Sequence, residues 1–527
     1  MNWNFYKLCS FALIVVLAQI SQAQENRYLS PIFSAVDVQK DMVYGNNISI
    51  LTGAPAPIDL LMDIYSPAGD TMANRPVWII LHTGTFLPPL FNQQVTGARS
   101  DSTVVNVCKR LAAMGYVAIA ATNRQGWIAT SIDDDIRIGS LLQAAYRGMQ
   151  DTRTCIRFLR KSVAEDNNPF GIDGDKIGVW GIGTGGYLAL GAATLDDPEE
   201  VELPKFLNSA TFTSLADTAL LGNFDGTSAG QISLPNHVGY SSDFSICVNL
   251  GGALADASWL DGKPNEPSFV GFHTITDRLA PFGTSDVTEP VLGLVLFPNA
   301  SGARIAIDSA NSKGNNDVFN GIPSELDPLN AKIQAFKDVD VIPALPTDTI
   351  KAGTDHFYPF FTSGAEGSPW DWWSLTDLQQ VVAGTNAALG TDFNADSLHL
   401  DGLETNPDMS AEKGNRYLDT IFMVVTPRAY YAFGLDSTST SIPDLTKYEV
   451  GLSLAPNPSQ GLVEVNTAID SPMHRIIIRD ISGRVMLIQN RIQTNYLRLN
   501  HTDITPGLYF MEIHFEKGKV TEKVVFN

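Results

Sequence analysis

The segment from Lys176 to Leu190 constrains the fold of this chain more than any other. It reads Lys-Ile-Gly-Val-Trp-Gly-Ile-Gly-Thr-Gly-Gly-Tyr-Leu-Ala-Leu, so a short apolar run meets a cluster of glycines and a helical pattern follows directly. A buried strand, a sharp turn and a helix in immediate succession are typical of α/β domains, and glycine accepts the unusual backbone angles of such a turn. The segment therefore predicts an α/β domain with Gly183 at the apex of the turn.

Strand-like and helix-like segments alternate along residues 24–436. Continuous apolar runs are typical of buried parallel strands, and apolar residues spaced by three and four predict helices. This alternation predicts a mostly parallel sheet with helices on both faces. We expect strands over residues 58–65, 76–81, 116–121, 177–180, 245–250 and 268–272, and helices over residues 104–114, 142–159, 375–389 and 411–425.

Two stretches break this rhythm. Residues 286–350 are rich in Asn, Asp, Pro and Gly, which predicts an insertion or lid over the carboxyl edge of the sheet. The Ser- and Thr-rich stretch that opens residues 437–448 predicts a linker. Beyond it, residues 449–527 carry short alternating strands separated by Ser-Gly, Pro-Gly and Lys-Gly turns, so we expect a small all-β sandwich there.

The N-terminus has the features of a secretory signal peptide over residues 1–23. Lys7 supplies a positive charge, residues 11–17 are apolar, and Ser21-Gln22-Ala23 offers small residues for cleavage. We therefore expect the Sec translocon as a partner and a mature chain that begins at Gln24. The mature chain would keep three cysteines, which we expect to be buried thiols, with one disulfide left open as an alternative: Cys108, Cys155 and Cys247.

Composition excludes several classes of function. The formal net charge of −22 repels phosphate backbones and anionic lipids, so we expect no nucleic-acid partner. No window after the signal peptide is long and apolar enough to predict an integral membrane segment. No cysteine or histidine spacing indicates zinc, and the acidic run Asp133–Asp135 lacks the ligand spacing of a calcium loop. We therefore expect neither a metal nor a cofactor.

Five segments resemble the α/β-hydrolase fold in its secreted carboxylesterase-like branch. Together they cover residues from about 58 to 430 and occur in the order that this fold uses. They are an oxyanion-loop segment, His82-Thr-Gly-Thr-Phe86; a helix segment, Ala145–Arg153; the approach to the elbow strand, Gly171–Val179; a segment with an acidic residue, His273-Thr-Ile-Thr-Asp277; and a later histidine segment, Asp355-His-Phe357.

The resemblance implies a catalytic serine at the apex of the elbow, but the chain has glycine there. The Gly-x-Ser-x-Gly position of the serine is held by Gly183, which has no side chain that could attack an ester. The resemblance further implies that His356 is the base and that Asp277 orients it. It also implies an oxyanion hole built from the backbone N–H of Thr184 and that of Thr83 or Gly84.

The missing nucleophile leaves three functions open. Loss of the triad serine costs about a millionfold in turnover, so the first hypothesis is a catalytically degenerate protein that binds an unknown small molecule or ester. The second is an active carboxylic-ester hydrolase that uses Thr184 or a water activated by His356. The third is a structural surface component. Each residue also has an ordinary interpretation: Thr184 as a helix N-cap, His356 as a core histidine and Asp277 as a partner of Arg278.

The last eighty or so residues resemble a second family. Ala455-Pro-Asn-Pro-Ser459, Asp480-Ile-Ser-Gly-Arg484 and Pro506-Gly-Leu-Tyr509 are similar, in order, to the three recurrent segments of the type A sorting domain of type IX secretion substrates in Bacteroidota-type bacteria. This resemblance implies passage through the periplasm and recognition by the type IX secretion machinery. It also implies an extracellular or outer-surface location for the protein.

Overall fold

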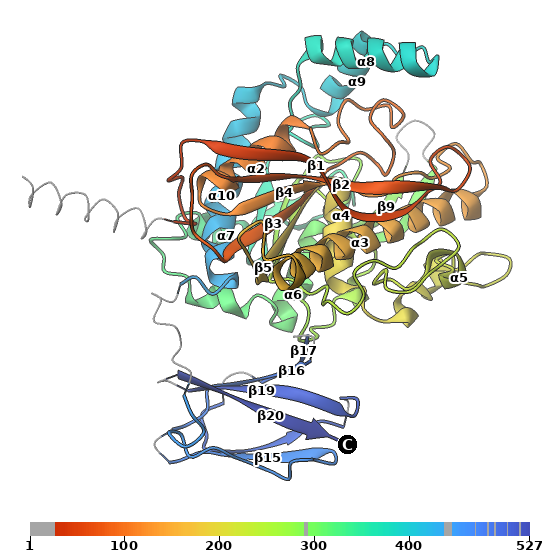
Figure 1. Ribbon diagram of the computed structural model, residues 1–527. Helices are drawn as coiled ribbons and strands as arrows, with labels where there is room; N and C mark the ends of the chain where they lie inside the picture. The colour runs from red at the N-terminus through yellow and green to blue at the C-terminus, as the bar shows by residue number, and fades with distance from the viewer. Residues whose placement is uncertain are drawn as a thin grey trace, which may run out of the picture. The chain divides into compact units, whose positions relative to one another are not determined.

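The computed structural model describes residues 27–288, 294–436, 445–469, 471–481, 484–489, 492–502, 504–515 and 518–527. The chain divides into two compact units (Figure 1). One comprises the residues up to Val238 together with Phe244–Asp261 and Pro267–Phe433, and the other comprises Gly239–Asp243, Gly262–Glu266 and Gly434–Asn527. The predicted signal peptide and residues 437–444 of the predicted linker lie outside the described residues.

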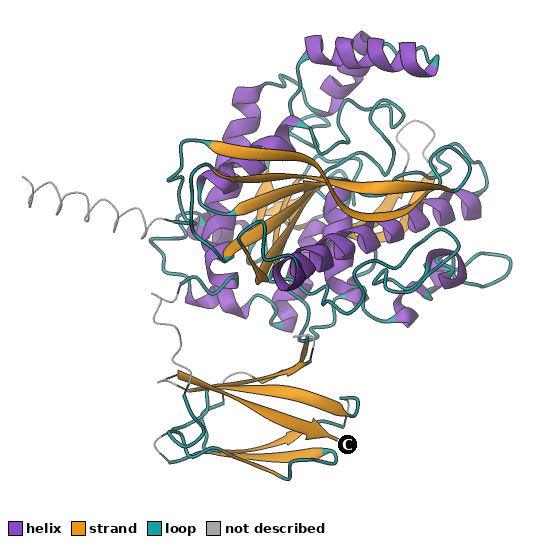
Figure 2. Cartoon of the chain, viewed as in Figure 1, coloured by secondary structure: helices purple, strands orange, loops and turns teal. Residues whose placement is uncertain are grey.

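The first unit is built on an eight-stranded, mostly parallel sheet (Figure 2). The strand order is β1-β2-β4-β3-β5-β6-β8-β13, and only the pairs β1–β2 and β2–β4 are antiparallel. This confirms the mixed α/β class that the alternation predicted. The strands are β1 (Val36–Ser49), β2 (Ala56–Pro67), β3 (Arg75–Leu81), β4 (Val117–Ala121), β5 (Ile172–Ile182), β6 (Ile246–Leu250), β8 (Ser268–Thr274) and β13 (Phe357–Phe360).

Helices pack against both faces of this sheet. Successive residues of a strand point to opposite faces, so each strand contributes side chains to both layers. On β3, Ile79 joins the main core with residues of α3 and α4, whereas the Trp78 ring contacts Phe433 at the end of α10, with centroids 5.4 Å apart. The helices of this unit are α2 (Ser102–Ala113), α3 (Asp134–Glu165), α4 (Thr184–Thr194), α5 (Thr218–Leu221), α6 (Ala303–Lys313), α7 (Asn330–Phe336), α8 (Leu375–Leu389), α9 (Ala395–Thr405), α10 (Ala411–Ala432) and the 3₁₀ helices η1 (Pro198–Val201), η2 (Pro204–Phe206), η3 (Ala257–Trp259) and η4 (Asp317–Gly321).

The polar stretch over residues 286–350 differs from the lid that we expected. It contains α6, which packs Ala303, Ala306, Ile307 and Ala310 into the main core. A Cβ on Gly271 of β8 would lie 2.5 Å from the Ile307 side chain, so helix and strand are in close contact. The stretch is therefore largely the crossover between β8 and β13. Its small apolar residues, spaced at helical intervals among many polar ones, made it look like a loop.

A small apolar cluster lies apart from the main core. It joins Leu90 to α8 and α9 through Leu378, Val382 and Leu398. We predicted α8 within its observed bounds, whereas α9 was missed. Much of the remaining surface of α8 is exposed, including Val381. Two small sheets complete the unit: a three-stranded one of β7 (Ala253–Leu254), β10 (Val295–Gly302) and β9 (Thr284–Thr288), and a two-stranded one of β11 (Asp340–Val341) and β12 (Ile350–Lys351).

A buried ion pair ties the end of β4 to α3. Arg124 and Asp151 are both inaccessible to solvent, and the Arg124 Nε lies 2.9 Å from an Asp151 carboxylate oxygen. The Asp151 carboxylate also accepts the backbone N–H of Arg124 at 2.7 Å. The three remaining cysteines are free and buried, as expected.

The second unit is all β. It has two antiparallel sheets, β14-β15-β18 and β17-β16-β19-β20, around an apolar core of its own that includes Val463, Met511 and Val524. The short strands that we predicted for this region are present. The strands are β14 (Ser453–Ala455), β15 (Leu462–Asn466), β16 (Arg475–Asp480), β17 (Val485–Gln489), β18 (Tyr496–Asn500), β19 (Gly507–Phe515) and β20 (Gly518–Phe526).

Candidate functional site

The sharp turn between β5 and α4 has the backbone of an elbow. Gly183 is the N-cap of α4 and has φ 56° and ψ −121°, a combination that is costly for residues with a side chain. Its N–H donates to the Leu250 carbonyl at 2.8 Å, and its own carbonyl accepts the Gly186 N–H at 2.9 Å. Thr184 is therefore the first residue of the helix and not its cap.

The space beside Gly183 is already occupied. A Cβ built on this glycine would lie 2.8 Å from the Cβ of Thr83 and closer still to the Thr83 hydroxyl. Strands β3 and β5 are parallel neighbours, with Leu81 paired to Gly181. The segments that follow the two strands therefore begin at the same edge of the sheet, and this brings Thr83 and Gly183 together. The hydroxyl at this edge therefore belongs to Thr83, on the neighbouring loop.

The loop after β3 is held in a strained conformation. Gly84 has φ 122°, and a Cβ on it would lie 2.6 Å from the Cα of Gly97. The Gly84 carbonyl accepts the Leu87 N–H at 3.0 Å and the Asn92 amide at 3.3 Å. Thr85 also lies in the left-handed region, with φ 51°. These contacts fix the segment that we expected to supply oxyanion donors, next to the half-buried N-terminus of α4 at Thr184.

Asp277 lies three residues beyond the end of β8 and is buried. Its Oδ1 accepts the N–H groups of Leu279 and Ala280 at 2.7 and 3.1 Å. Burial raises the pKa of this carboxyl to about 7, against the lowering effect of those two hydrogen bonds. A Cβ on Gly367, in the loop that follows β13, would lie 3.2 Å from Asp277 Oδ1. A glycine thus faces Asp277 from the loop after β13.

His356 lies at the other end of the sheet. It immediately precedes β13, and its carbonyl accepts the Gly271 N–H at 3.1 Å. Strand β13 runs parallel to β8 with Phe360 opposite Thr274, so His356 is four residues, or about 13 Å, before the edge at which Asp277 lies. The structure does not bring the expected base and its expected orienting acid together.

The surroundings of His356 also differ from those of a catalytic base. The Arg428 Nε–H donates to His356 Nδ1 at 3.2 Å, and the imidazole packs against Phe319 with ring centroids 4.8 Å apart. Burial, and then the charge of Arg428, lowers the pKa of His356 to about 3. The ring is therefore neutral throughout the pH range in which proteins are normally studied.

The histidine beside Asp277 is His273, the first residue of the segment that carries this acid. Its Nε2 lies 3.4 Å from Asp277 Oδ2 and 3.1 Å from the Ala280 carbonyl. Because a carbonyl can only accept, Nε2 carries the proton, and within the described structure the Nδ1 atom is buried without a hydrogen-bond partner. Burial lowers the pKa of His273 to about 4. Its one basic nitrogen is enclosed in the core.

His82, at the start of the strained loop, is similarly enclosed. Its Nδ1 lies 2.6 Å from the Thr83 carbonyl, so Nδ1 donates, and burial lowers the pKa of His82 to about 4. Both imidazoles near this edge are neutral and engaged in supporting the backbone.

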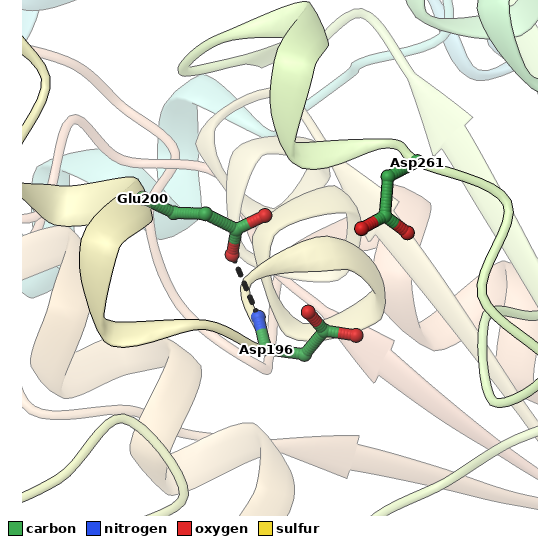
Figure 3. A group of neighbouring side chains, drawn as sticks. All are labelled: Asp196, Glu200 and Asp261. Carbon is green, nitrogen blue, oxygen red and sulfur yellow. Dashed lines mark hydrogen bonds between the residues drawn. The ribbon is translucent and has the colours of Figure 1, made fainter. Parts of the chain in front are cut away.

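A group of three acidic side chains elsewhere gathers potential metal ligands. The carboxylate oxygens of Asp196, Glu200 and Asp261 lie within 4.8 Å of one another (Figure 3). The Glu200 carboxylate already accepts the backbone N–H groups of Asp196 and Asp197, at 2.9 and 3.0 Å, as part of a capping box at η1. This helix-capping role accounts for the position of Glu200.

Within the described ranges, no helix has the length and apolar character needed to cross a membrane.

Among known protein families, one matches the C-terminal region of the chain. Residues 453–527 match the family described as the secretion system C-terminal sorting domain. The match indicates that the chain is exported and is extracellular or at the cell surface, as its sequence motifs implied. No curated protein matches the sequence.

Solved structures similar to the chain include esterases, at low overall similarity. A bifunctional GH43-CE protein of Bacteroides eggerthii is 15% identical with a TM-score of 0.31, covering 53% of this chain and 31% of that one. Esterase B of Lactobacillus rhamnosis is 16% identical with a TM-score of 0.26, covering 51% and 76%. Esterase 2 of Thermogutta terrifontis is 19% identical with a TM-score of 0.25, covering 47% and 73%. The chain thus spans about a third of the first protein and about three-quarters of the other two.

Proposed function

We propose that this is an exported α/β-hydrolase-fold protein that has lost ester hydrolysis and works by binding. The contact between Thr83 and Gly183 carries this proposal. A serine side chain at residue 183 would overlap the Thr83 side chain, so the structure has no room for the missing nucleophile unless Thr83 moves.

The imidazole positions support the same conclusion. Hydrolysis by a serine or by an activated water needs a base that reaches the reacting oxygen through a free nitrogen. His356 lies about 13 Å along the sheet from the edge with Asp277, and its Nδ1 already accepts from Arg428. His273 has its basic Nδ1 buried. Asp277, with its pKa near 7, is only partly ionised at neutral pH and is poorly suited to stabilise an imidazolium.

The signal-peptide features of residues 1–23 and the sorting-domain match near the C-terminus support a route of export. We propose that residues 1–23 direct Sec-dependent entry into the periplasm, and that residues 449–527 are then handled by the type IX secretion machinery. The mature α/β unit, over residues 24–436, and the linker, over residues 437–448, would reach the outer surface or the medium. The match over residues 453–527 supports the last step.

Hydrolysis is tested directly on the purified mature chain. We expect no turnover of p-nitrophenyl acetate or butyrate above buffer and no labelling by a fluorophosphonate probe, with a serine esterase as the positive control. The variants T184A and H356A distinguish the alternative. Turnover that T184A abolishes would establish Thr184 as a nucleophile, and turnover that H356A alone abolishes would establish the water mechanism; either result would overturn the proposal.

A further inference from the structure

A polar cavity opens at the amino edge of the sheet, on the side away from Gly183. It has a volume of about 290 Å³, near the lower end of small-molecule sites, and is bounded by α6, η4, α7 and the turn before β13. Amide side chains dominate its wall, with Asn320, Asn330 and Gln334 at the rim. His356 lines it as well.

The inner wall is held rigid by its own hydrogen bonds. Asn311 donates to the Asp355 carbonyl at 2.7 Å and accepts from the Asn316 amide at 2.6 Å. The Asn316 Oδ1 in turn accepts the Phe269 N–H at 2.7 Å. The Asn311 and Asn316 side chains therefore hold the wall in place. Binding of a ligand would depend on the other polar groups of the cavity.

Three other groups keep hydrogen-bonding capacity toward the cavity. Because His356 Nδ1 accepts from Arg428, the proton of this neutral ring is on Nε2, which can donate. Asn330 uses its carbonyl to accept from Gln334 at 3.3 Å, which leaves its NH₂ group as a donor. Asn320 uses its NH₂ group, at 3.3 Å from an Asp317 carboxylate oxygen, which leaves its carbonyl as an acceptor.

The wall of the cavity carries three carboxylates, Asp317, Asp327 and Asp355, and the last two are paired with cations. Asp327 is paired with Arg428 through two hydrogen bonds of 2.8 and 3.2 Å. Asp355 is paired with Lys337 at 2.9 Å. Within the described residues, the carboxylates here do not form a group of three ligand atoms within 4.8 Å, as those around Asp196 do. Among the described residues the cavity therefore has no cluster of metal ligands, and its excess of carboxylates over cations disfavours an anionic molecule.

The backbone at His356 is held in an unfavourable conformation. Its φ of 60° places a residue with a side chain in the left-handed region, and such strain persists only where surrounding contacts impose it. In this conformation the imidazole packs against Phe319, accepts a hydrogen bond from Arg428 and lines the cavity. Phe319 and Ile322 contribute the apolar part of the lining.

We propose that this cavity binds a neutral, hydroxyl-rich small molecule of about monosaccharide size. A hydroxyl group both donates and accepts, which matches a wall that offers a neutral imidazole N–H, an amide NH₂ group and an amide carbonyl. The ring carbons of such a molecule would contact Phe319 and Ile322. This site is separate from the elbow, so it stands whether or not the elbow has lost hydrolysis.

The test uses the mature chain with named probes. D-glucose, D-galactose, N-acetyl-D-glucosamine and myo-inositol are each titrated to about 10 mM, since weak specific binding lies near the millimolar range, and followed by saturation-transfer NMR and calorimetry. Asn330→Ala should weaken binding about fivefold, the value of one neutral hydrogen bond. Asn320→Trp should abolish binding because the indole would fill the cavity. Both residues are exposed, so neither change should impair folding.

A matched control and a salt series make the result decisive. Asn500→Ala removes an equally exposed asparagine in the second unit and should leave binding unchanged. Raising the ionic strength from about 0.05 to 0.5 M should also leave it unchanged, because a neutral ligand is not screened. The proposal fails if no probe binds, if binding ignores both cavity variants, or if putrescine or inorganic phosphate binds in their place with sensitivity to Asn330→Ala.

Discussion

The side chain of Thr83 fills the space into which a side chain at Gly183 would project. The two residues follow adjacent parallel strands, so the contact is set by the sheet and does not depend on a flexible loop. In this chain, Gly183 at the turn after β5 and Thr83 in the loop after β3 are therefore sterically coupled. A side chain added at residue 183 therefore requires a change at Thr83.

The first prediction tests this coupling through stability. Gly183→Ser should lower the free energy of unfolding by about 2 kcal/mol, because the new side chain overlaps Thr83 in a region with little room. The double variant Thr83→Gly/Gly183→Ser should be more stable than the sum of the two single changes by about 1–2 kcal/mol. Urea unfolding followed by circular dichroism measures each value.

Gly183→Ala is the matched control for this cycle. It adds the same Cβ without a hydroxyl, so its cost should be close to that of Gly183→Ser if the effect is steric. Strictly additive costs for the two sites would show that Thr83 moves aside freely, and the coupling would then be absent.

The second prediction concerns Asp277 and pH. The pKa of this buried carboxyl is raised from 3.8 to about 7, so the folded state holds a proton that the unfolded state releases. The stability that this provides is present below pH 3.8 and is lost as the pH rises through 7, an upper bound of about 4 kcal/mol at 1.36 kcal/mol per pH unit. Asp277→Asn keeps the neutral form at every pH.

Asp277→Asn should therefore unfold with nearly wild-type stability at pH 4 and with greater stability than wild type at pH 8. Thermal and urea unfolding across this range measures the difference. Asp401→Asn, at an exposed position on α9, is the control and should run parallel to wild type. An Asp277→Asn variant that is less stable than wild type at pH 8 would show that the carboxylate is ionised and paired, as in a working triad.

Most of the regular elements could be predicted because their patterns are local. The apolar run at residues 177–180 and the helical spacing over 142–159 mark parts of β5 and α3, which extend further at both ends. The helix predicted near residues 375–389 is α8. Each such pattern needs only the periodicity of one segment and the burial of one face.

The candidate site could not be predicted as fully, because its geometry depends on one short strand. Phe357–Phe360 has four residues and contains a proline, so it did not look like a strand. Once this segment is the last strand of the sheet, His356 must lie at the sheet's amino edge. The order of motifs along the chain indicated a histidine for the triad, but sequence order does not tell which end of a strand a residue occupies. The overlap of Thr83 with residue 183 is likewise a contact across strands.

The third prediction concerns the buried pair Arg124–Asp151. Asp151→Ala should destabilise the first unit by about 3–5 kcal/mol, because it leaves the Arg124 guanidinium buried without its counter-ion. The exposed pair Glu412–Arg416 on α10 is the control, and Glu412→Ala should change stability by less than about 0.5 kcal/mol. The free energies of unfolding are compared at one pH. Equal effects of the two changes would mean that water reaches the Arg124 site.

The last prediction concerns export by the C-terminal unit. This unit has its own apolar core and its own sheets, so it should carry its sorting information to an unrelated cargo. A periplasmic reporter joined to residues 437–527 should reach the medium or surface of a host with type IX secretion, whereas the chain ending at residue 436 should stay in the periplasm.

Val463→Asp, which places an unpaired charge in the unit's core, should abolish export of the reporter because folding and recognition are lost together. Glu464→Ala, at the neighbouring and more exposed position on the same strand, should leave export intact. If the truncated chain reached the surface as well as the full chain does, the export signal would have to lie within the first unit.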